Sequence, residues 1–363
     1  MLIMDFSKAF DKVPHRCLLN KLESYGIDGS LGSWLKHWLT TRTQTVILDG
    51  EASSPVKVKS GVPQGTVLGP LMFLLYINDI GTNINHSRVK LFADDCLLYK
   101  IVNNKEDETE LQDDLTKLQH WADKWQMSFN IKKCFLLSVR KKGHQITSQY
   151  KIYGKILEAV EHHPYLGVEL QSNLKWDHHI NQITGKANRS LAFLRRNLSR
   201  CPEQTKERAY VALVRPHVEF ASAVWDPHLK KDIREVETIQ RRAARFVKGV
   251  YKREDGIVTQ LLKELGWSSL ETRRRCHRME LLHVSLNGEN SAITIPSYLK
   301  IPPHRYNTRS QATIINPATQ GDIYKNSFFP RTITEYNRLP PDIRQIKTEA
   351  TFKQALRTHF NYR

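Results

Sequence analysis

Two adjacent aspartates have the surroundings of a metal-binding site. Asp94 and Asp95 lie between apolar stretches of strand character, residues 89–93 before them and 96–99 after them. Neighbouring carboxylates at the tip of a hairpin repel each other, and burial without a cation would force one of them to stay protonated. A hard divalent cation such as Mg²⁺ removes this cost. A solvated turn is the alternative interpretation, because aspartate is common in turns.

A third aspartate ends the apolar run at the start of the chain. Residues 2–4 are Leu-Ile-Met, and they predict a short central strand that ends at Asp5. If this strand lies beside the hairpin, the three carboxylates converge. Three carboxylates can hold two Mg²⁺ ions about 4 Å apart, an arrangement that stabilises both the attacking and the leaving oxygen in phosphoryl transfer.

A glycine- and proline-rich loop lies between these aspartates in the sequence. Residues 60–71 include Gly61, Pro63 and Gly65 and open onto an apolar helix predicted at 71–80. Glycine lets the backbone approach a ligand closely. Free N–H groups at a helix N-terminus also bind phosphate well. An ordinary connection between a strand and a helix is the alternative.

The elements that must position these residues follow from hydrophobic periodicity. In the first half, this periodicity predicts helices at 14–25, 31–39 and 106–127. It also predicts a hairpin with strands at 43–48 and 56–59. The second half predicts helices at 176–197, 203–213, 230–248 and 269–285, and two short ones between 328 and 360.

Charge is distributed very unevenly along the 363 residues. The net charge is +18, and residues 173–363 carry 34 Lys and Arg against 18 Asp and Glu, whereas the first 172 residues are nearly balanced. Such an excess indicates a polyanionic partner, nucleic acid first and an acidic membrane surface second. Clusters of arginine in the basic helices are the candidates for phosphate binding, with a solvated helix face as the alternative: Arg195, Arg196, Arg241, Arg242, Arg245, Arg273, Arg274 and Arg275.

Cysteine and histidine patterns do not predict a metal site. The five cysteines are far apart and form no Cys-x-x-Cys pair, which argues against a disulfide framework or a zinc site and favours a reducing interior, nuclear or cytoplasmic. We interpret the pairs at 162–163 and 178–179 as structural histidines. The most apolar window, residues 67–77, is too short to span a bilayer, so we expect no membrane partner.

Several motifs in one order resemble a known family. The chain has Ile-Met-Asp-Phe-Ser-Lys-Ala-Phe-Asp at 3–11, Ser-Gly-Val-Pro-Gln-Gly at 60–65 and Phe-Ala-Asp-Asp at 92–95. It continues with Asn-Ile-Lys-Lys-Cys at 130–134 and Tyr-Leu-Gly at 165–167. This order resembles the reverse transcriptases of non-LTR (LINE-type) retrotransposons, most of all the jockey-like and chicken-repeat-like groups. The resemblance extends loosely into the basic half.

The resemblance implies roles for the residues at the first three motifs. Asp5, Asp94 and Asp95 match the metal-binding catalytic carboxylates. The carbonyl of Phe6 matches a backbone metal ligand, and Phe10 matches the steric gate that excludes a ribose 2′-hydroxyl. The nucleotide and template pocket would be lined by Pro63, Gln64 and Gly65. An ordinary core phenylalanine is the less favoured alternative for Phe10.

Two later motifs are also matched by the family. Lys133 matches a lysine that protonates pyrophosphate, although the sequence alone favours a solvated lysine. Tyr165, Leu166 and Gly167 match the strand that grips the primer. The basic helices would hold the RNA–DNA duplex by its phosphates.

The resemblance implies an α+β fold, a right-hand polymerase palm with an antiparallel sheet backed by helices, followed by a helical basic thumb. The expected division is a palm at 1–172, a thumb at 173–287, a linker at 288–312 and a small helical segment at 313–363. The implied activity is RNA-directed DNA polymerisation with two Mg²⁺ ions, or Mn²⁺ in their place, as in target-primed cDNA synthesis. The implied partners are an RNA template, a DNA primer and deoxynucleoside triphosphates; the oligomeric state is left open.

Members of this family carry an endonuclease and fingers segments ahead of the first catalytic aspartate. We expect this chain to have neither, and therefore to have weak or no polymerase activity unless the fingers are supplied. Two alternatives remain from the sequence. One is a catalytically inert, nucleic-acid-binding remnant of such an element, and the other is a basic interaction or membrane-surface module with accidental aspartate pairs.

Overall fold

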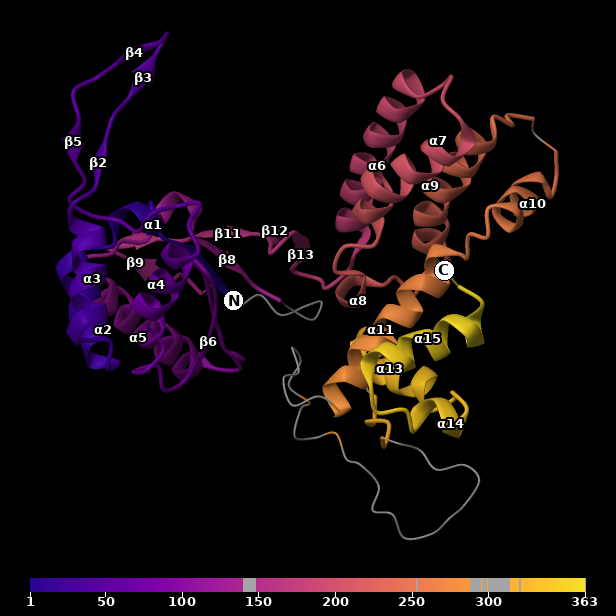
Figure 1. The fold of residues 1–363 in the computed structure, drawn as a ribbon. Coiled ribbons are helices and arrows are strands. Elements are labelled where there is room, and N and C mark those ends of the chain that lie inside the picture. The colour runs from indigo at the N-terminus through magenta and orange to yellow at the C-terminus, as the bar shows by residue number, and fades with distance from the viewer. Residues whose placement is uncertain are drawn as a thin grey trace. The chain divides into compact units, whose positions relative to one another are not determined.

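The computed structural model describes residues 1–139, 148–252, 254–287, 295, 299, 314–319 and 321–362 (Figure 1). They form two compact units, residues 1–163 with 171–173, and residues 164–170 with 174–363. The division between the units falls within the hairpin of strands β12 (His162–Tyr165) and β13 (Val168–Gln171).

A five-stranded sheet forms the centre of the first unit. Its strand order is β11 (Glu158–Val160), β8 (Phe135–Leu137), β1 (Leu2–Asp5), β7 (Asp95–Tyr99) and β6 (Arg88–Phe92). All neighbours are antiparallel except β11 and β8, which are parallel. The first strand of the chain is therefore central, as the sequence predicts.

One face of this sheet is packed against helices. Leu2 and Met4 of β1, with Cys96 and Leu98 of β7, belong to the core cluster of this unit. The helices that complete the unit are α1 (Ala9–Lys12), α2 (His15–Ser24), α3 (Gly29–Thr40), α4 (Leu68–Ile77), α5 (Lys105–Lys124) and the 3₁₀ turn η1 (Ile131–Lys133). Because side chains alternate along a strand, residues 3, 5, 95 and 97 point to the opposite face.

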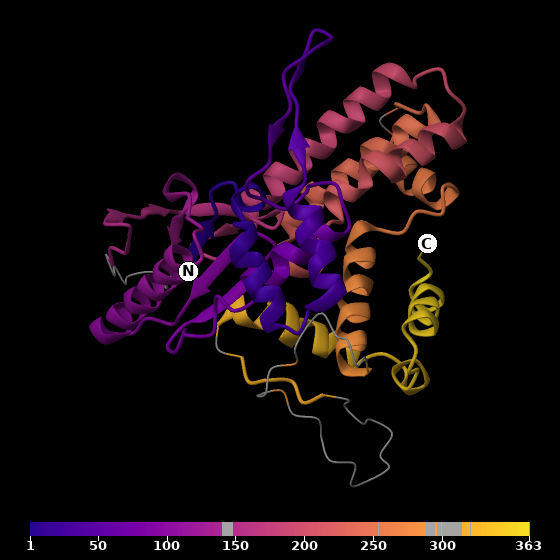
Figure 2. The same ribbon diagram turned by 60° about the vertical axis from the view of Figure 1, so that its left-hand side comes forward.

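A long hairpin extends from the first unit. Strand β2 (Thr43–Gln44) pairs with β5 (Val56–Lys57), and β3 (Ile47–Leu48) pairs with β4 (Glu51–Ala52). Figure 2 shows these four short strands as a two-stranded arm. The predicted hairpin is confirmed. A second small hairpin consists of β9 (Lys151–Ile152) and β10 (Lys155–Ile156).

The second unit is helical and has two core clusters. Its elements are α6 (Asp177–Asn197), α7 (Glu203–Leu213), η2 (Arg215–Val218), α8 (Ser222–Trp225), α9 (Lys230–Lys248), α10 (Ile257–Glu264), α11 (Leu270–Asn287), α12 (Asp322–Lys325), α13 (Phe328–Tyr336), α14 (Pro341–Arg344) and α15 (Glu349–Phe360). The first cluster joins α6, α7 and α9, and the second joins α11 to α13, α14 and α15.

The C-terminal region differs from the expectation in one respect. Three helices, not two, follow residue 328, because Pro340 and Pro341 begin a short helix of their own, where proline is favoured. The linker predicted at 288–312 lies outside the described residues except for Ile295 and Leu299. Within the part of the chain that the structure describes, no helix has the length and apolar character needed to cross a membrane.

Candidate active site

Strand pairing brings the first and last of the predicted carboxylates together. Asp5 of β1 and Asp95 of β7 are direct partners in the antiparallel ladder. Side chains of such partners lie on the same face, with Cβ atoms about 5 Å apart. This face is opposite to the one that packs against the helices, so the carboxylates do not compete with the apolar core.

Asp94 lies in the tight turn between β6 and β7. Phe92 and Asp95 are the last paired residues of the two strands, which leaves Ala93 and Asp94 as the connection. Ala93 has φ of 49°, a left-handed conformation that is uncommon for alanine. Unfavourable backbone of this kind is concentrated at functional sites.

Mutual repulsion within this group affects the pKa of Asp95. Burial raises the pKa of the Asp95 carboxyl, and the neighbouring charges of Asp94 and Asp5 raise that pKa further. His163 and Lys133 act in the opposite direction. The three carboxylates therefore share one electrostatic environment that carries excess negative charge.

Lys133 lies beside this group. Its Nζ is 3.4 Å from Oδ2 of Asp5, and its side chain is 62% exposed. The turn η1 that carries it is tied to β1, because the backbone N–H of Asn130 donates a hydrogen bond to the carbonyl of Asp5. One lysine cannot neutralise three carboxylates, and hard oxygen donors of this kind suit Mg²⁺ or Mn²⁺. The donor set fits the implied metal ions.

The glycine-rich loop packs directly against the segment that follows β1. A Cβ on Gly61 would lie within 3.0 Å of backbone atoms of Phe10 and Asp11, so only glycine fits there. The N–H of Val62 donates to the carbonyl of Phe10, and Nε2 of Gln64 donates to Oδ1 of Asp11 at 3.1 Å. The loop and the Phe10 segment therefore form one surface.

Two further contacts fix the conformation of this surface. A Cβ on Gly69 would come 2.0 Å from the carbonyl oxygen of Pro63, so the start of α4 also requires glycine. The hydroxyl of Thr66 donates to the same carbonyl and accepts from the N–H of Gly69. The ring of Phe10 stacks on Phe73 with centroids 4.6 Å apart. Phe6, by contrast, has a buried ring that stacks on Phe129.

A cavity of about 1100 Å³ adjoins this loop at Ser60. Its lining includes the cations Lys12, Arg16, Lys36 and Lys59 and none of the three aspartates. The three carboxylates lie elsewhere and are each partly exposed.

Comparison with known proteins shows which family the chain resembles. Residues 1–170 match the family described as reverse transcriptase (RNA-dependent DNA polymerase). The probable RNA-directed DNA polymerase from transposon BS of Drosophila melanogaster is 29% identical over 267 residues, 68% of this chain and 28% of that protein. The RNA-directed DNA polymerase from mobile element jockey of Drosophila funebris is 26% identical over 288 residues, 76% of this chain and 31% of that protein. Residues 1–170 are therefore similar to the reverse transcriptase family, and about two thirds of the chain is similar to RNA-directed DNA polymerases of mobile elements.

The chain spans less than a third of the length of those two relatives. Among solved structures, apo telomerase from Candida tropicalis has a TM-score of 0.40 and 12% identity, covering 76% of this chain and 44% of that one. The assignment does not depend on that weak similarity. The resemblance to reverse transcriptases of non-LTR retrotransposons and the α+β fold class are confirmed.

The segment matched to the primer grip lies in the second unit. Leu166 and Gly167 are both exposed and form the turn between β12 and β13. Their φ values are 48° and 81°, and left-handed backbone at both positions is typical of tight hairpin turns. Tyr165 precedes the turn and is partly buried.

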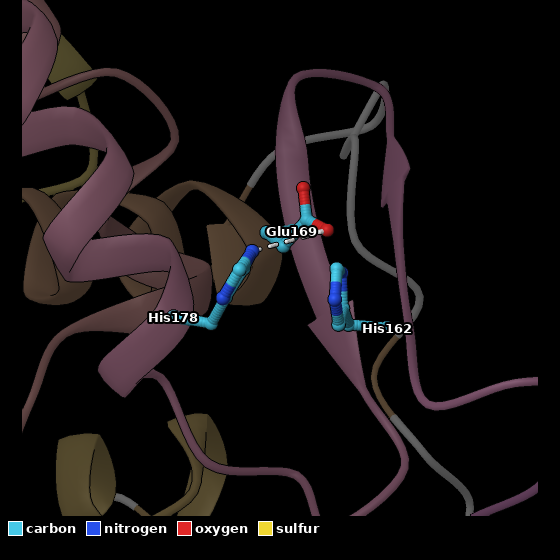
Figure 3. Close-up of side chains that lie close together, drawn as sticks. All are labelled: His162, Glu169 and His178. Carbon is cyan, nitrogen blue, oxygen red and sulfur yellow. Dashed lines mark ion pairs between the residues drawn. The ribbon is translucent and has the colours of Figure 1, made fainter.

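The histidines near this turn have structural partners. His178 lies 3.8 Å from the buried carboxylate of Glu169 (Figure 3). His162, also drawn there, belongs to the first unit. Nδ1 of His179 accepts a hydrogen bond from the N–H of Glu169, and its ring packs on Trp225. Burial lowers the pKa of His179 to about 4, so it is neutral at physiological pH.

The arginine clusters of the second unit fall into two classes. Arg195, Arg196 and Arg241 are exposed and make no ion pair within the described residues. Arg242 is also exposed, and it donates to Oδ1 of Asn188 at 2.8 Å. Arg245 is half-buried and donates to the carbonyl of Lys252. These five remain candidates for phosphate binding.

The expectation for the third cluster is wrong at two of its three positions. Arg274 is fully buried and its Nε lies 2.7 Å from Asp226, and Arg273 is buried and paired with Glu219. Neither guanidinium is available to a phosphate, because each is already neutralised inside the protein. Arg275 is more exposed and lies 3.5 Å from Glu335.

Two residues of this region are not identified from the sequence. Asp11 holds Gln64 by a side-chain hydrogen bond. His163 lies close enough to Asp95 to lower its pKa, and its ring contacts Phe135. Asp11 follows Phe10 within a matched motif and could have been considered from that position. The placement of His163 depends on the parallel pairing of β11 with β8, which the sequence does not reveal.

Proposed function

We propose that this chain adds deoxynucleotides to the 3′-hydroxyl of a DNA primer paired with an RNA template. One observation carries the proposal: Asp5 lies opposite Asp95 with Asp94 adjacent, and their charges raise the pKa of Asp95. This is a partly exposed site with excess negative charge at one end of the sheet. A divalent cation and a triphosphate are complementary to it.

Each carboxylate has a defined part in this proposal. Asp5 and Asp95 would hold metal from neighbouring strands, and Asp94 from the turn, with the carbonyl of Phe6 as a backbone ligand. When bound, two Mg²⁺ ions lower the pKa of the primer 3′-hydroxyl and neutralise the leaving pyrophosphate. Lys133, which is exposed and lies 3.4 Å from Asp5, would donate a proton to that leaving group.

The neighbouring surface would select the nucleotide. The stacking of Phe10 on Phe73 fixes the ring in the segment after β1, where it would exclude a 2′-hydroxyl. Pro63, Gln64 and Gly65 would contact the nucleotide and the template base. The hydrogen bond from Gln64 to Asp11 orients this loop before any ligand is bound.

The outer face of α6 supports binding of a nucleic-acid duplex. Lys186, Arg189, Phe193 and Arg196 follow one another at helical spacing and are all exposed. The three cations would neutralise phosphates, and Phe193, which is 55% exposed, would contact sugars or bases. We therefore propose residues 1–172 as the palm and 173–287 as the thumb.

Primer extension tests the proposal. We expect Mg²⁺-dependent extension of a DNA primer on an RNA template. Asp94→Ala should abolish it, whereas Asp49→Ala, in the remote hairpin, should not. Salt-sensitive binding of the duplex with no extension under any condition would favour the inert remnant instead.

A further inference from the structure

An exposed aromatic ring packs against the turn between β12 and β13. A Cβ placed on Gly167 would lie 2.8 Å from Cε1 of Phe220 and 3.4 Å from its Cζ. The ring edge therefore occupies the space that a side chain at position 167 would need. A side chain at this position would require the ring of Phe220 to move, and the φ of 81° found there also favours glycine.

The turn needs such support from outside. Leu166 has φ of 48°, which is unfavourable for a residue with a Cβ, and its side chain is 39% exposed. Because the side chain is partly exposed, its burial contributes little free energy to offset the cost of the left-handed backbone. The ring of Phe220 is the neighbour that restricts the turn at Gly167.

The backbone of Phe220 is held rigidly although its ring is not buried. Its N–H donates to the carbonyl of Pro216 at 2.9 Å, and its own carbonyl accepts from Nε1 of Trp225 at 2.8 Å. Trp225 is fully buried, and the preceding residue, Glu219, is ion-paired with Arg215 and Arg273.

The side chain of Phe220 nevertheless remains 59% exposed and is not a member of the core cluster around Trp225. An exposed aromatic ring on a fixed backbone is a good surface for a base or a sugar, because little conformational entropy is lost when the ligand stacks on it.

We propose that Phe220 is a positioning residue for the primer strand. Its ring holds the Leu166–Gly167 turn in the conformation that contacts the primer, and its exposed face adds a surface on which the terminal nucleotide stacks. This inference rests on the proposed function, which assigns the turn to the primer.

Duplex binding by the full chain tests the inference. The probe is an RNA–DNA primer–template with 2-aminopurine at the primer 3′ end. We expect Phe220→Ala to weaken binding about 10-fold, in line with the loss of one stacked ring, and to reduce quenching of the terminal base. Phe220→Tyr should restore both. Gly167→Ala should reproduce the defect, because its Cβ displaces the ring. The control is Leu213→Ala, which shortens another exposed apolar side chain (55% exposed) and should bind as wild type.

Amide hydrogen exchange without nucleic acid keeps the test independent of the proposed function. Phe220→Ala should accelerate exchange at residues 166–168 and leave the core of α9 unchanged. Unchanged exchange at the turn would overturn the positioning role, and so would wild-type binding and quenching by Phe220→Ala. If the wild-type chain binds no duplex while exchange at the turn accelerates, the proposed function fails and the support of the turn by Phe220 stands.

Discussion

Two groups of aspartates, Asp226 in the second unit and Asp5, Asp94 and Asp95 in the first, differ in how their charge is neutralised. In the second unit, Asp226 is almost completely buried and lies 2.7 Å from Nε of Arg274 and 2.8 Å from Nε of Arg278. In the first unit, Asp5, Asp94 and Asp95 lie close together with Lys133 as the ion-paired cation, and that lysine is largely exposed. Carboxylates that are ion-paired within the protein stabilise the fold. Carboxylates in excess of the nearby cations are available to a positively charged ligand.

The largest effect is expected where the internal neutralisation is broken. Asp226→Asn leaves the buried guanidinium group of Arg274 without its anion and leaves Arg278 with Glu335 alone. We expect the second unit to lose about 3–5 kcal/mol of unfolding free energy, as for other buried ion pairs that lose one partner. Urea unfolding followed by circular dichroism measures this. Asp255→Asn, an exposed aspartate of the same unit, should change stability by less than about 0.5 kcal/mol. Equal stability of the two variants would contradict the comparison.

Removing a carboxylate of the first unit should have the opposite character. Asp94→Asn should leave stability without metal unchanged or raise it, because a repulsive charge is lost. It should abolish stabilisation by Mg²⁺, which for the wild type amounts to about 2.7 kcal/mol at 100 times the dissociation constant. Thermal unfolding with and without Mg²⁺ measures both effects, and Asp49→Asn serves as the control. Equal Mg²⁺ stabilisation in the Asp94→Asn variant would show that the turn does not bind the ion.

The raised pKa of Asp95 makes a prediction about pH. Burial and the charges of Asp94 and Asp5 raise this pKa above 3.8 in the folded state. Between pH 3.8 and the folded-state pKa, the folded protein therefore keeps a proton on Asp95 that the unfolded protein has released. Stability from this group is therefore complete below pH 3.8 and falls as pH rises through the folded-state pKa. Unfolding in EDTA across this range should show the decline in the wild type and a smaller one in Asp95→Asn. A rise in stability that Asp95→Asn removes would reverse the sign and refute the assignment.

The smallest effect on stability is expected at Lys133. Its side chain is 62% exposed, so the ion pair with Asp5 is screened by solvent. Lys133→Met should change the unfolding free energy by no more than about 0.5 kcal/mol. It should slow primer extension under conditions where the wild type is active, because the proton donor is lost. A variant that extends primers at the wild-type rate would exclude Lys133 from the reaction.

Much of the scaffold can be predicted from periodicity. The helices at 203–213 and 230–248 have the predicted boundaries, because their apolar residues repeat at helical spacing and their ends carry clear breaks. Short elements such as α10 (Ile257–Glu264) are not predicted. They contain too few turns for a periodic signal, and packing decides them.

The candidate site divides in the same way. The carboxylates can be recognised because each ends an apolar strand or interrupts two of them, and pairing of β1 with β7 then follows. The burial of Arg273 and Arg274 could not be predicted from the one-signed charge of their cluster. Their acidic partners, Glu219 and Asp226, are about fifty residues away in the sequence, and nothing local marks them as neighbours.

Direct counting of bound ions tests the central claim, that three carboxylates of the first unit leave charge available to divalent cations. Electron paramagnetic resonance of Mn²⁺ titrated into the wild-type chain and into Asp95→Asn makes this count. We predict saturable binding of two ions to the wild type that is weakened or lost in the variant. Identical binding curves for the two proteins would contradict the account.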